Sequence, residues 1–110
     1  MNDKEVLAAL YAIVENRRDN PKEGSYTCYL LDKGIDKILK KVGEECSETI
    51  IAAKNGVNSE TVYETADLIY HLMVMLVQQG IPLDDVLAEL DRRSEKTGNL
   101  KKFHVVDKNS

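Results

Sequence analysis

Four acidic residues form two pairs that share one spacing. The pairs are Glu45 with Glu48 and Glu64 with Asp67, each three residues apart. Residues three apart on an α-helix lie on the same face, about one turn from each other. Two such helices packed together can aim four carboxylates at one point, where like charges about 4 Å apart repel by roughly 4 kcal/mol per pair at an intermediate dielectric. A cation would offset that repulsion, and an all-oxygen donor set suits Mg²⁺, or Mn²⁺ as a substitute, better than zinc or copper.

The first pair, taken alone, has an ordinary explanation. At about 100° per residue, a mixed-charge arc of about 100° contains Lys37, Lys41, Glu44, Glu45 and Glu48. Lys40 and Lys41 also precede Glu44 and Glu45 by four residues, the spacing of helical ion pairs. Such a face is usually solvated, so this stretch by itself favours a solvated surface over a metal site.

The second pair lies in different surroundings. Glu64, Asp67 and His71 fall within about 60° of one another on a helix, in a stretch (62–77) that is otherwise mostly apolar on all sides. A helix that is apolar all round is expected to be buried, and an unpaired buried charge costs several kcal/mol. A metal ion shared with the first pair could compensate these acids. Lysines could do so instead, and the candidates are Lys37, Lys41 and Lys54. The second pair favours the metal.

His71 is the most ambiguous member of this group. A lone histidine in an apolar helix is more often a core residue than a ligand, but one turn after Asp67 it could hydrogen-bond a ligating carboxylate and orient it. Di-iron bundles use a Glu-x-x-His motif, which neither acidic pair contains. The sequence therefore predicts oxygen-only coordination, with His71 as a supporting residue.

A carboxylate-held Mg²⁺ keeps open positions for water and phosphate oxygens. Two such ions can promote an in-line displacement at phosphorus. Candidate phosphate contacts are Lys37, Lys40, Lys41 and Lys54. No P-loop pattern is present. These residues indicate metal-dependent hydrolysis of a phosphoanhydride.

The elements that would carry these residues are all helical. Apolar periodicity and capping residues predict helices over 3–18, with Asn2 as its cap, and over 26–33, 35–54, 59–79 and 82–96. Asn58 is expected to cap the fourth, and Gly56 and Gly80 to end the third and fourth. No run alternates with period two, so the expected fold is an all-α bundle of four to five helices, formed by residues 1–98 and followed by a polar tail at 99–110.

The apolar face of the third predicted helix comprises Ile35, Ile38, Leu39, Val42, Cys46, Ile50 and Ala53. We expect Cys46 to be a buried, inert thiol. The last helix is expected to turn four residues inward: Leu83, Val86, Leu87 and Leu90.

Bulk properties narrow the class of protein. A chain of 110 residues is expected to form one domain, and so small a core favours oligomerisation. A net charge of −4 without a basic footprint argues against nucleic-acid binding. The chain shows no apolar leader, and its longest apolar stretch, 66–77, is too short to span a bilayer. We expect a cytoplasmic protein with both thiols reduced and no membrane partner.

The acid spacing resembles that of the all-α, MazG-like nucleotide pyrophosphohydrolases, in which Glu-x-x-Glu is followed after a spacer by Glu-x-x-Asp. Two strings are more specific: Lys-Lys-Val-Gly-Glu-Glu at 40–45 and Asp-Leu-Ile-Tyr-His at 67–71. With Ser-Tyr-Thr at 25–27 and Ala-Ala-Lys-Asn at 52–55, they make the chain similar to the phosphoribosyl-ATP pyrophosphohydrolase family over about 7–93.

The resemblance implies a reaction and a metal site. Water would attack between the α and β phosphorus atoms of phosphoribosyl-ATP, giving phosphoribosyl-AMP and pyrophosphate in the second step of histidine biosynthesis. Mg²⁺ would be held by Glu45, Glu48, Glu64 and Asp67, with Glu44 as a further ligand or base. Homodimers or dimers of dimers are implied, with sites close to subunit contacts. Residues 94–110 match no pattern of the family.

Two alternatives stay open at this point. The same chemistry could serve a house-cleaning enzyme that acts on a free or damaged nucleoside triphosphate. The other alternative is a non-catalytic helical dimerisation module whose acids pair with lysines.

Overall fold

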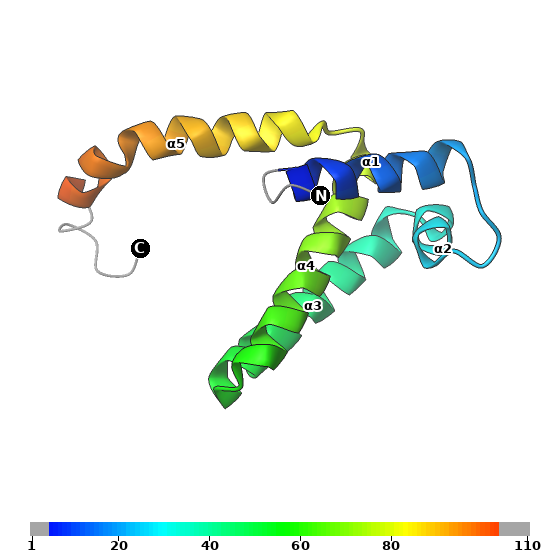
Figure 1. The fold of residues 1–110 in the computed structure, drawn as a ribbon, viewed down its shortest axis with the longest axis horizontal. Coiled ribbons are helices and arrows are strands. Elements are labelled where there is room, and N and C mark those ends of the chain that lie inside the picture. Colours follow the sequence, from blue (N-terminus) through cyan, green and yellow to red (C-terminus); the bar gives the residue numbers. More distant parts are fainter. Residues whose placement is uncertain (1–4, 104–110) are drawn as a thin grey trace.

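The part of the chain that the structure describes forms five helices joined by short connections (Figure 1). The computed structural model describes residues 5–103, and it describes side-chain surroundings for residues 5–95. The helices are α1 (Val6–Asp19), α2 (Tyr26–Lys33), α3 (Ile35–Asn55), α4 (Asn58–Gln79) and α5 (Leu83–Phe103). No strand occurs within residues 5–103, so the predicted all-α class is confirmed.

Helices α3 and α4 form an antiparallel hairpin and make the most extensive helix–helix contact of the described chain (Figure 1). Gly56 ends α3 with φ 79° and Gly80 ends α4 with φ 70°, both in the left-handed region where a Cβ would be strained. Both C-caps were predicted. The Asn58 cap was wrong: Asn58 is the first residue of α4, and Val57 before it has no side-chain capping bond.

The apolar core lies where α1 and α2 pack against the N-terminal part of α3 and the C-terminal part of α4. Its members are Val14, Leu30, Ile38, Met73, Val74, Leu76, Val77 and Leu83. The Tyr11 hydroxyl donates a hydrogen bond of 2.8 Å to the carbonyl oxygen of Ile81 and so ties α1 to the turn before α5. The core therefore anchors one end of the hairpin and leaves the other projecting (Figure 1).

Burial along α4 is uneven. Most of the stretch from His71 to Val77 is buried, as the apolar pattern predicts. Near the free end of the hairpin, however, Val62 and Tyr63 are each 69% exposed. The prediction that the apolar stretch 62–77 is buried on all sides is thus right for its C-terminal half and wrong for its N-terminal half, because the core reaches only one end of the hairpin.

Helix α3 is rotated relative to the prediction. Its buried residues are Ile38, Glu45 and Ala52, seven apart and therefore in one line along the helix. The centre of the predicted apolar face lies about 85° around the helix from that line. As a result Leu39, Cys46, Ile50 and Ala53 are exposed, and the expectation of a buried Cys46 was wrong.

Helix α5 begins at Leu83, one residue after the predicted start at Pro82, and continues to Phe103, beyond the expected end at 96. Only Leu83 of its predicted inward residues is buried, whereas Val86 is half-buried and Leu87 and Leu90 are exposed. The helix runs away from the α3–α4 hairpin (Figure 1), which explains the missing burial.

Part of the expected tail, residues 99–103, belongs to α5, and residues 104–110 lie outside the described part of the chain, as does the predicted Asn2 cap. Within the described residues, no helix has the length and hydropathy needed to cross a bilayer.

Candidate metal centre

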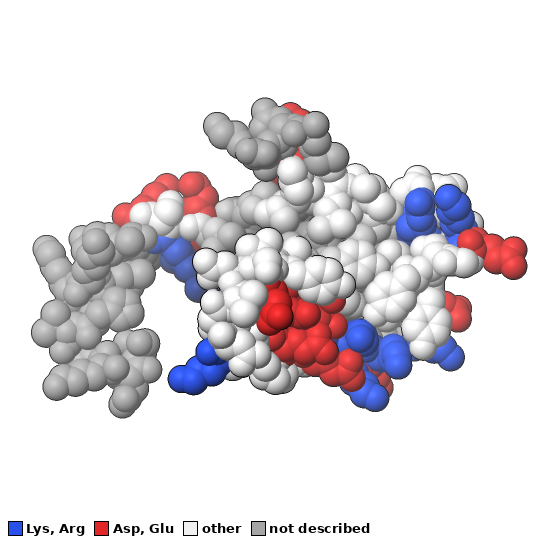
Figure 2. All heavy atoms as spheres, turned by 60° about the horizontal axis from the view of Figure 1, so that its bottom comes forward, with Lys and Arg blue, Asp and Glu red and all other residues white. Residues whose placement is uncertain are grey.

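The four predicted acids meet at the interface of α3 and α4. Donor atoms of Glu45, Glu48 and Glu64 lie within 4.8 Å of one another, and so do donor atoms of Glu45, Asp67 and His71. Glu45 belongs to both groups, so the acids form two adjoining triads and not one square. Figure 2 shows the acidic side chains of this face gathered in one patch, with lysine and arginine side chains at its border.

Thr49 joins the two backbones at the level of the acids. Its hydroxyl oxygen lies one turn after Glu45, 2.7 Å from the carbonyl oxygen of Glu45 on α3 and 3.2 Å from that of Glu64 on α4. One hydroxyl therefore contacts the backbone of an acid on each helix. This contact fixes the register in which the two acidic pairs face each other.

Glu45 is an unusual residue to find in the buried line of α3, since it is only 3% exposed. Burial, followed by the neighbouring Asp67 and Glu48, raises the pKa of Glu45 to about 7. Burial and the adjacent Glu48 also raise the pKa of Glu64. In the absence of a cation, ionisation of these carboxylates therefore costs free energy.

Lys41 supplies part of the compensation. Its Nζ lies 3.3 Å from Oε2 of Glu44 and 3.6 Å from Oε1 of Glu45. The hydrogen bond to Glu44 raises the pKa of Lys41, which stays charged. The ion pairing anticipated as the alternative to a metal thus exists, but it reaches only one oxygen of Glu45.

The second oxygens of two acids have no such partner. Oε2 of Glu45 and Oε2 of Glu64 are buried and have no hydrogen-bond partner among the described residues. Buried carboxylate oxygens are normally satisfied, and an orphaned one costs a few kcal/mol. Two orphaned oxygens in an all-carboxylate cluster fit a hard divalent cation such as Mg²⁺.

His71 is held between α2 and α4. Its Nδ1 lies 2.8 Å from the carbonyl oxygen of Asp67, which can only accept, so Nδ1 carries the proton and donates. Nδ1 also lies 3.2 Å from Oδ1 of Asp67. In the neutral ring Nε2 then accepts a hydrogen bond of 3.0 Å from the Tyr26 hydroxyl. Burial raises the pKa of Tyr26, so this hydroxyl keeps its proton at neutral pH. Both ring nitrogens thus have protein partners.

The predicted lysines are placed unequally around α3. Relative to Glu45, Lys41 lies about 40° away and Lys37 about 80°, on the side of Glu48. Lys40 lies about 140° away and Lys54 about 180°. Lys37 and Lys41 therefore share the acidic side of the helix, whereas Lys40 and Lys54 are exposed elsewhere.

Two residues that contact this cluster were not singled out from the sequence. The sequence does contain a signal for Thr49, because it lies one helical turn after Glu45 and therefore on the same face. Tyr26 lies 45 residues from His71 in the chain, so only the packing of α2 on α4 brings the two together.

Comparison with known proteins identifies relatives of this chain. Residues 7–94 match the model of the phosphoribosyl-ATP pyrophosphohydrolase family. A phosphoribosyl-ATP pyrophosphatase of Clostridium botulinum is 54% identical over 101 residues, covering 92% of each chain. A protein of the same name from Limosilactobacillus fermentum is 58% identical over 95 residues, covering 86% of this chain and 90% of that one. A bifunctional histidine biosynthesis protein of Caldanaerobacter subterraneus is 59% identical over 92 residues, which cover 84% of this chain and 45% of its own.

Proposed function

The chain belongs to the phosphoribosyl-ATP pyrophosphohydrolase family, and from this premise we propose that it hydrolyses phosphoribosyl-ATP in a Mg²⁺-dependent reaction. The products are phosphoribosyl-AMP and pyrophosphate, the second step of histidine biosynthesis, and the enzyme acts in the cytoplasm. The observation that carries the metal dependence is the buried, unpartnered Oε2 of Glu45 at the junction of the two donor groups.

Glu45, Glu48, Glu64 and Asp67 are the residues that would hold Mg²⁺, with Mn²⁺ as a possible substitute. The all-carboxylate group of Glu45, Glu48 and Glu64, with Asp67 beside Glu45, and the two orphaned oxygens support this assignment. When bound, the ion supplies positive charge that stabilises the negative charge developing on the phosphoanhydride. His71 orients Asp67, because both of its nitrogens are committed to protein partners.

The remaining charged side chains have roles in binding and proton transfer. Lys37 and Lys41 lie on the acidic side of α3 and contact the phosphate oxygens of the substrate, while Lys40 and Lys54 are more distant candidates. Glu44 is exposed beside Lys41 and belongs to neither donor group. It is therefore available to accept the proton of the attacking water, alongside Glu45 and Glu48 as the other acids of the reaction.

The enzyme acts as a homodimer, or as a dimer of such dimers. Large apolar residues near the free end of the α3–α4 hairpin are exposed in the single chain, and they are Ile50, Ile51, Val57, Val62 and Tyr63. Several large exposed apolar side chains near one end of the molecule are typical of a subunit contact. A second copy, packed hairpin against hairpin, would cover these side chains and also close off the acidic cluster from one side.

The proposal is tested by measuring pyrophosphate release from phosphoribosyl-ATP and from a panel of ordinary nucleoside triphosphates, with Mg²⁺ and with a chelator. We expect turnover of phosphoribosyl-ATP that the chelator abolishes. A preference for ordinary triphosphates would instead identify a house-cleaning enzyme. Absence of any Mg²⁺ or Mn²⁺ binding would identify a dimerisation module.

A further inference from the structure

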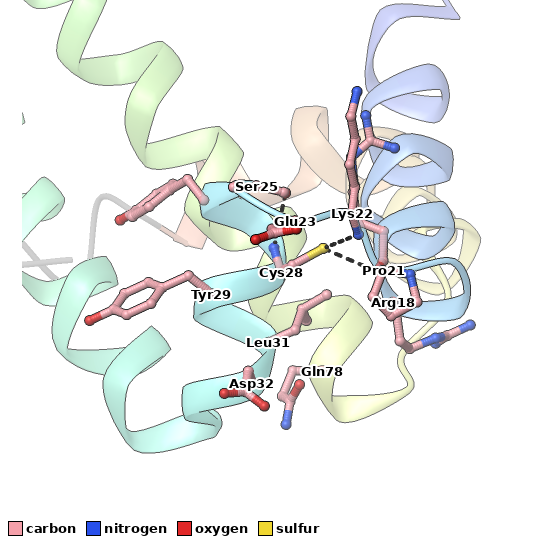
Figure 3. A pocket seen from close by; sticks show the side chains of 13 residues that line it. Arg18, Pro21, Lys22, Glu23, Ser25, Cys28, Tyr29, Leu31, Asp32 and Gln78 are labelled. Carbon is pink, nitrogen blue, oxygen red and sulfur yellow. Dashed lines mark hydrogen bonds between the residues drawn. The ribbon is translucent and has the colours of Figure 1, made fainter.

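A second candidate binding region lies beside the metal centre, on the other side of Tyr26. It is an open cavity of about 830 Å³ between the end of α1, the loop after it and α2 (Figure 3). That volume is within the range of sites for small molecules of nucleotide size. None of the residues assigned above to the metal or the phosphates lines this cavity.

The loop that forms the cavity wall is fixed by hydrogen bonds around one thiol. The backbone N–H of Lys22 donates to Sγ of Cys28 at 3.3 Å, and the thiol donates to the carbonyl oxygen of Arg17 at 3.4 Å. The Ser25 hydroxyl caps α2 by accepting from the N–H of Cys28 at 3.1 Å. Figure 3 shows Cys28 in the middle of these contacts. These hydrogen bonds connect the loop to the end of α1 and to the start of α2, so the cavity wall has a defined conformation.

Tyr26 connects the cavity to the metal centre. Its hydroxyl hydrogen-bonds His71, which adjoins the acids, and its ring also lines the cavity. Tyr29 lines the cavity too, and its ring stacks on that of Tyr26 with centroids 6.2 Å apart. Both side chains are exposed, and Nζ of Lys33 lies 5.7 Å from the centroid of the Tyr29 ring. The exposed aromatic surface of Tyr26 and Tyr29 at the cavity suits contact with a purine ring.

The cavity also has a cationic wall. Arg17, Arg18 and Lys22 line it. The Arg18 guanidinium is held by Asp19, with Nε 2.9 Å from Oδ1, and Figure 3 shows it turned away from Cys28 and Tyr29. Among the described residues, neither Arg17 nor Lys22 has a carboxylate within ion-pair distance. The acidic lining residues are Glu23 and Asp32, and in Figure 3 Asp32 lies at the other end of the cavity from Lys22.

Phosphoribosyl-ATP differs from ATP by a ribose 5-phosphate on the adenine. An enzyme that selects it over ATP must recognise that additional phosphate group, which lies at a distance from the triphosphate. We propose that this cavity is the specificity site, with Arg17 and Lys22 binding the phosphate of the phosphoribosyl group and Tyr26 and Tyr29 contacting the purine. The inference rests on the proposed function, because it assumes that the metal centre holds the triphosphate of the same substrate.

The test compares three variants with the wild-type enzyme: Arg17→Gln, Lys22→Gln and, as matched control, Arg18→Gln. Each removes one positive charge from the same wall. Hydrogen bonds to a charged phosphate predict that Arg17→Gln and Lys22→Gln each lower kcat/KM for phosphoribosyl-ATP by about 10- to 100-fold, mainly through KM. Hydrolysis of ATP, which lacks the second phosphate, should stay unchanged, as should both activities of Arg18→Gln.

Calorimetry with the product provides a readout that is independent of turnover. Phosphoribosyl-AMP should bind the Arg17→Gln and Lys22→Gln variants more weakly than the wild type by a similar factor, whereas AMP should bind all four proteins equally. If both variants match the Arg18→Gln control, or if ATP hydrolysis falls together with that of phosphoribosyl-ATP, the cavity does not read the second phosphate. A wild-type enzyme that does not prefer phosphoribosyl-ATP would overturn the proposed function itself, which the variants cannot do.

Discussion

The two sides of helix α3 in the α3–α4 hairpin differ from what is expected of a surface helix: one side buries a charged residue and the other exposes apolar residues. Toward α4, α3 buries Glu45 between Ile38 and Ala52. Away from it, α3 exposes apolar residues, with Ile50 68% exposed. A surface helix normally does the reverse. This difference supports the proposal that the buried acids bind a cation and that the exposed apolar residues contact another subunit.

The buried side is the more demanding of the two. A buried carboxylate needs partners placed within hydrogen-bond or coordination distance, whereas an apolar surface needs only cover. The contacts agree with this contrast. Thr49 hydrogen-bonds the backbone of the acid-bearing helices, and His71, which Tyr26 holds in turn, lies 3.2 Å from Oδ1 of Asp67. No polar contact involves the side chains of Ile50, Ile51 or Val62.

The largest effect is expected from removing an acid of the buried side. Glu64→Ala should lower turnover of phosphoribosyl-ATP by about 10³-fold or more, because several kcal/mol of charge stabilisation depend on the bound ion. The fold should persist, since the substitution removes a charge that burial disfavours. Asp36→Asn, an exposed acid of α3 far around the helix from Glu45, is the control. Near-normal activity of Glu64→Ala would refute the metal assignment.

The apolar side can be tested through assembly. Ile50→Glu should weaken subunit association by about 100-fold or more, because it places a charge in a surface that the second copy must desolvate. The single chain should fold as before, since Ile50 is exposed in it. Sedimentation equilibrium measures the association, with Asp84→Lys on α5 as the control. An unchanged oligomer would mean that this side is not the subunit contact.

Thr49 offers a smaller, more specific perturbation of the buried side. Thr49→Val keeps the shape and removes the hydroxyl that contacts the backbones of Glu45 and Glu64. We expect about a 10-fold rise in the Mg²⁺ concentration that gives half-maximal activity, the usual scale for a residue that positions a ligand. Thr49→Ser should restore the wild-type value. If valine and serine behave alike, the hydroxyl has no positioning role.

The smallest effect is a pH dependence of stability. Without metal, the pKa of Glu45 is about 7 in the folded chain, above its ordinary value of 4.5. The folded state therefore holds a proton that the unfolded state releases between these pH values, so stability falls as pH rises from about 4.5 to 7 and stays low above that. Thermal unfolding should show a midpoint higher by about 10 °C at pH 5 than at pH 8.

Two controls sharpen this measurement. Saturating Mg²⁺ should raise the midpoint at pH 8 much more than at pH 5, because the ion needs the ionised carboxylate. Glu45→Gln should flatten the pH profile. A midpoint that rises with pH in the wild-type protein without metal would contradict the buried, raised-pKa Glu45.

Much of this could be predicted from local sequence. The span of α2 was predicted correctly, and the ends of α3 and α4 came within one residue, because Gly34, Gly56 and Gly80 mark helix ends by backbone conformation alone. The acid spacing predicted a shared face on each helix for the same local reason. The length of α5 was predicted wrongly, because a glycine such as Gly98 commonly ends a helix. In the structure α5 continues past Gly98 to Phe103.

The rotation of α3 could not be predicted from its own pattern. Apolar periodicity identifies a stripe that will be covered but not which partner covers it. The relative positions of two residues on the same helix, such as Glu45 and Thr49 or Asp67 and His71, therefore follow from the sequence alone. Tertiary packing alone placed Glu45 in the interface with α4, brought Tyr26 to His71 and left Cys46 exposed. Each of these outcomes depends on how separate helices pack against one another.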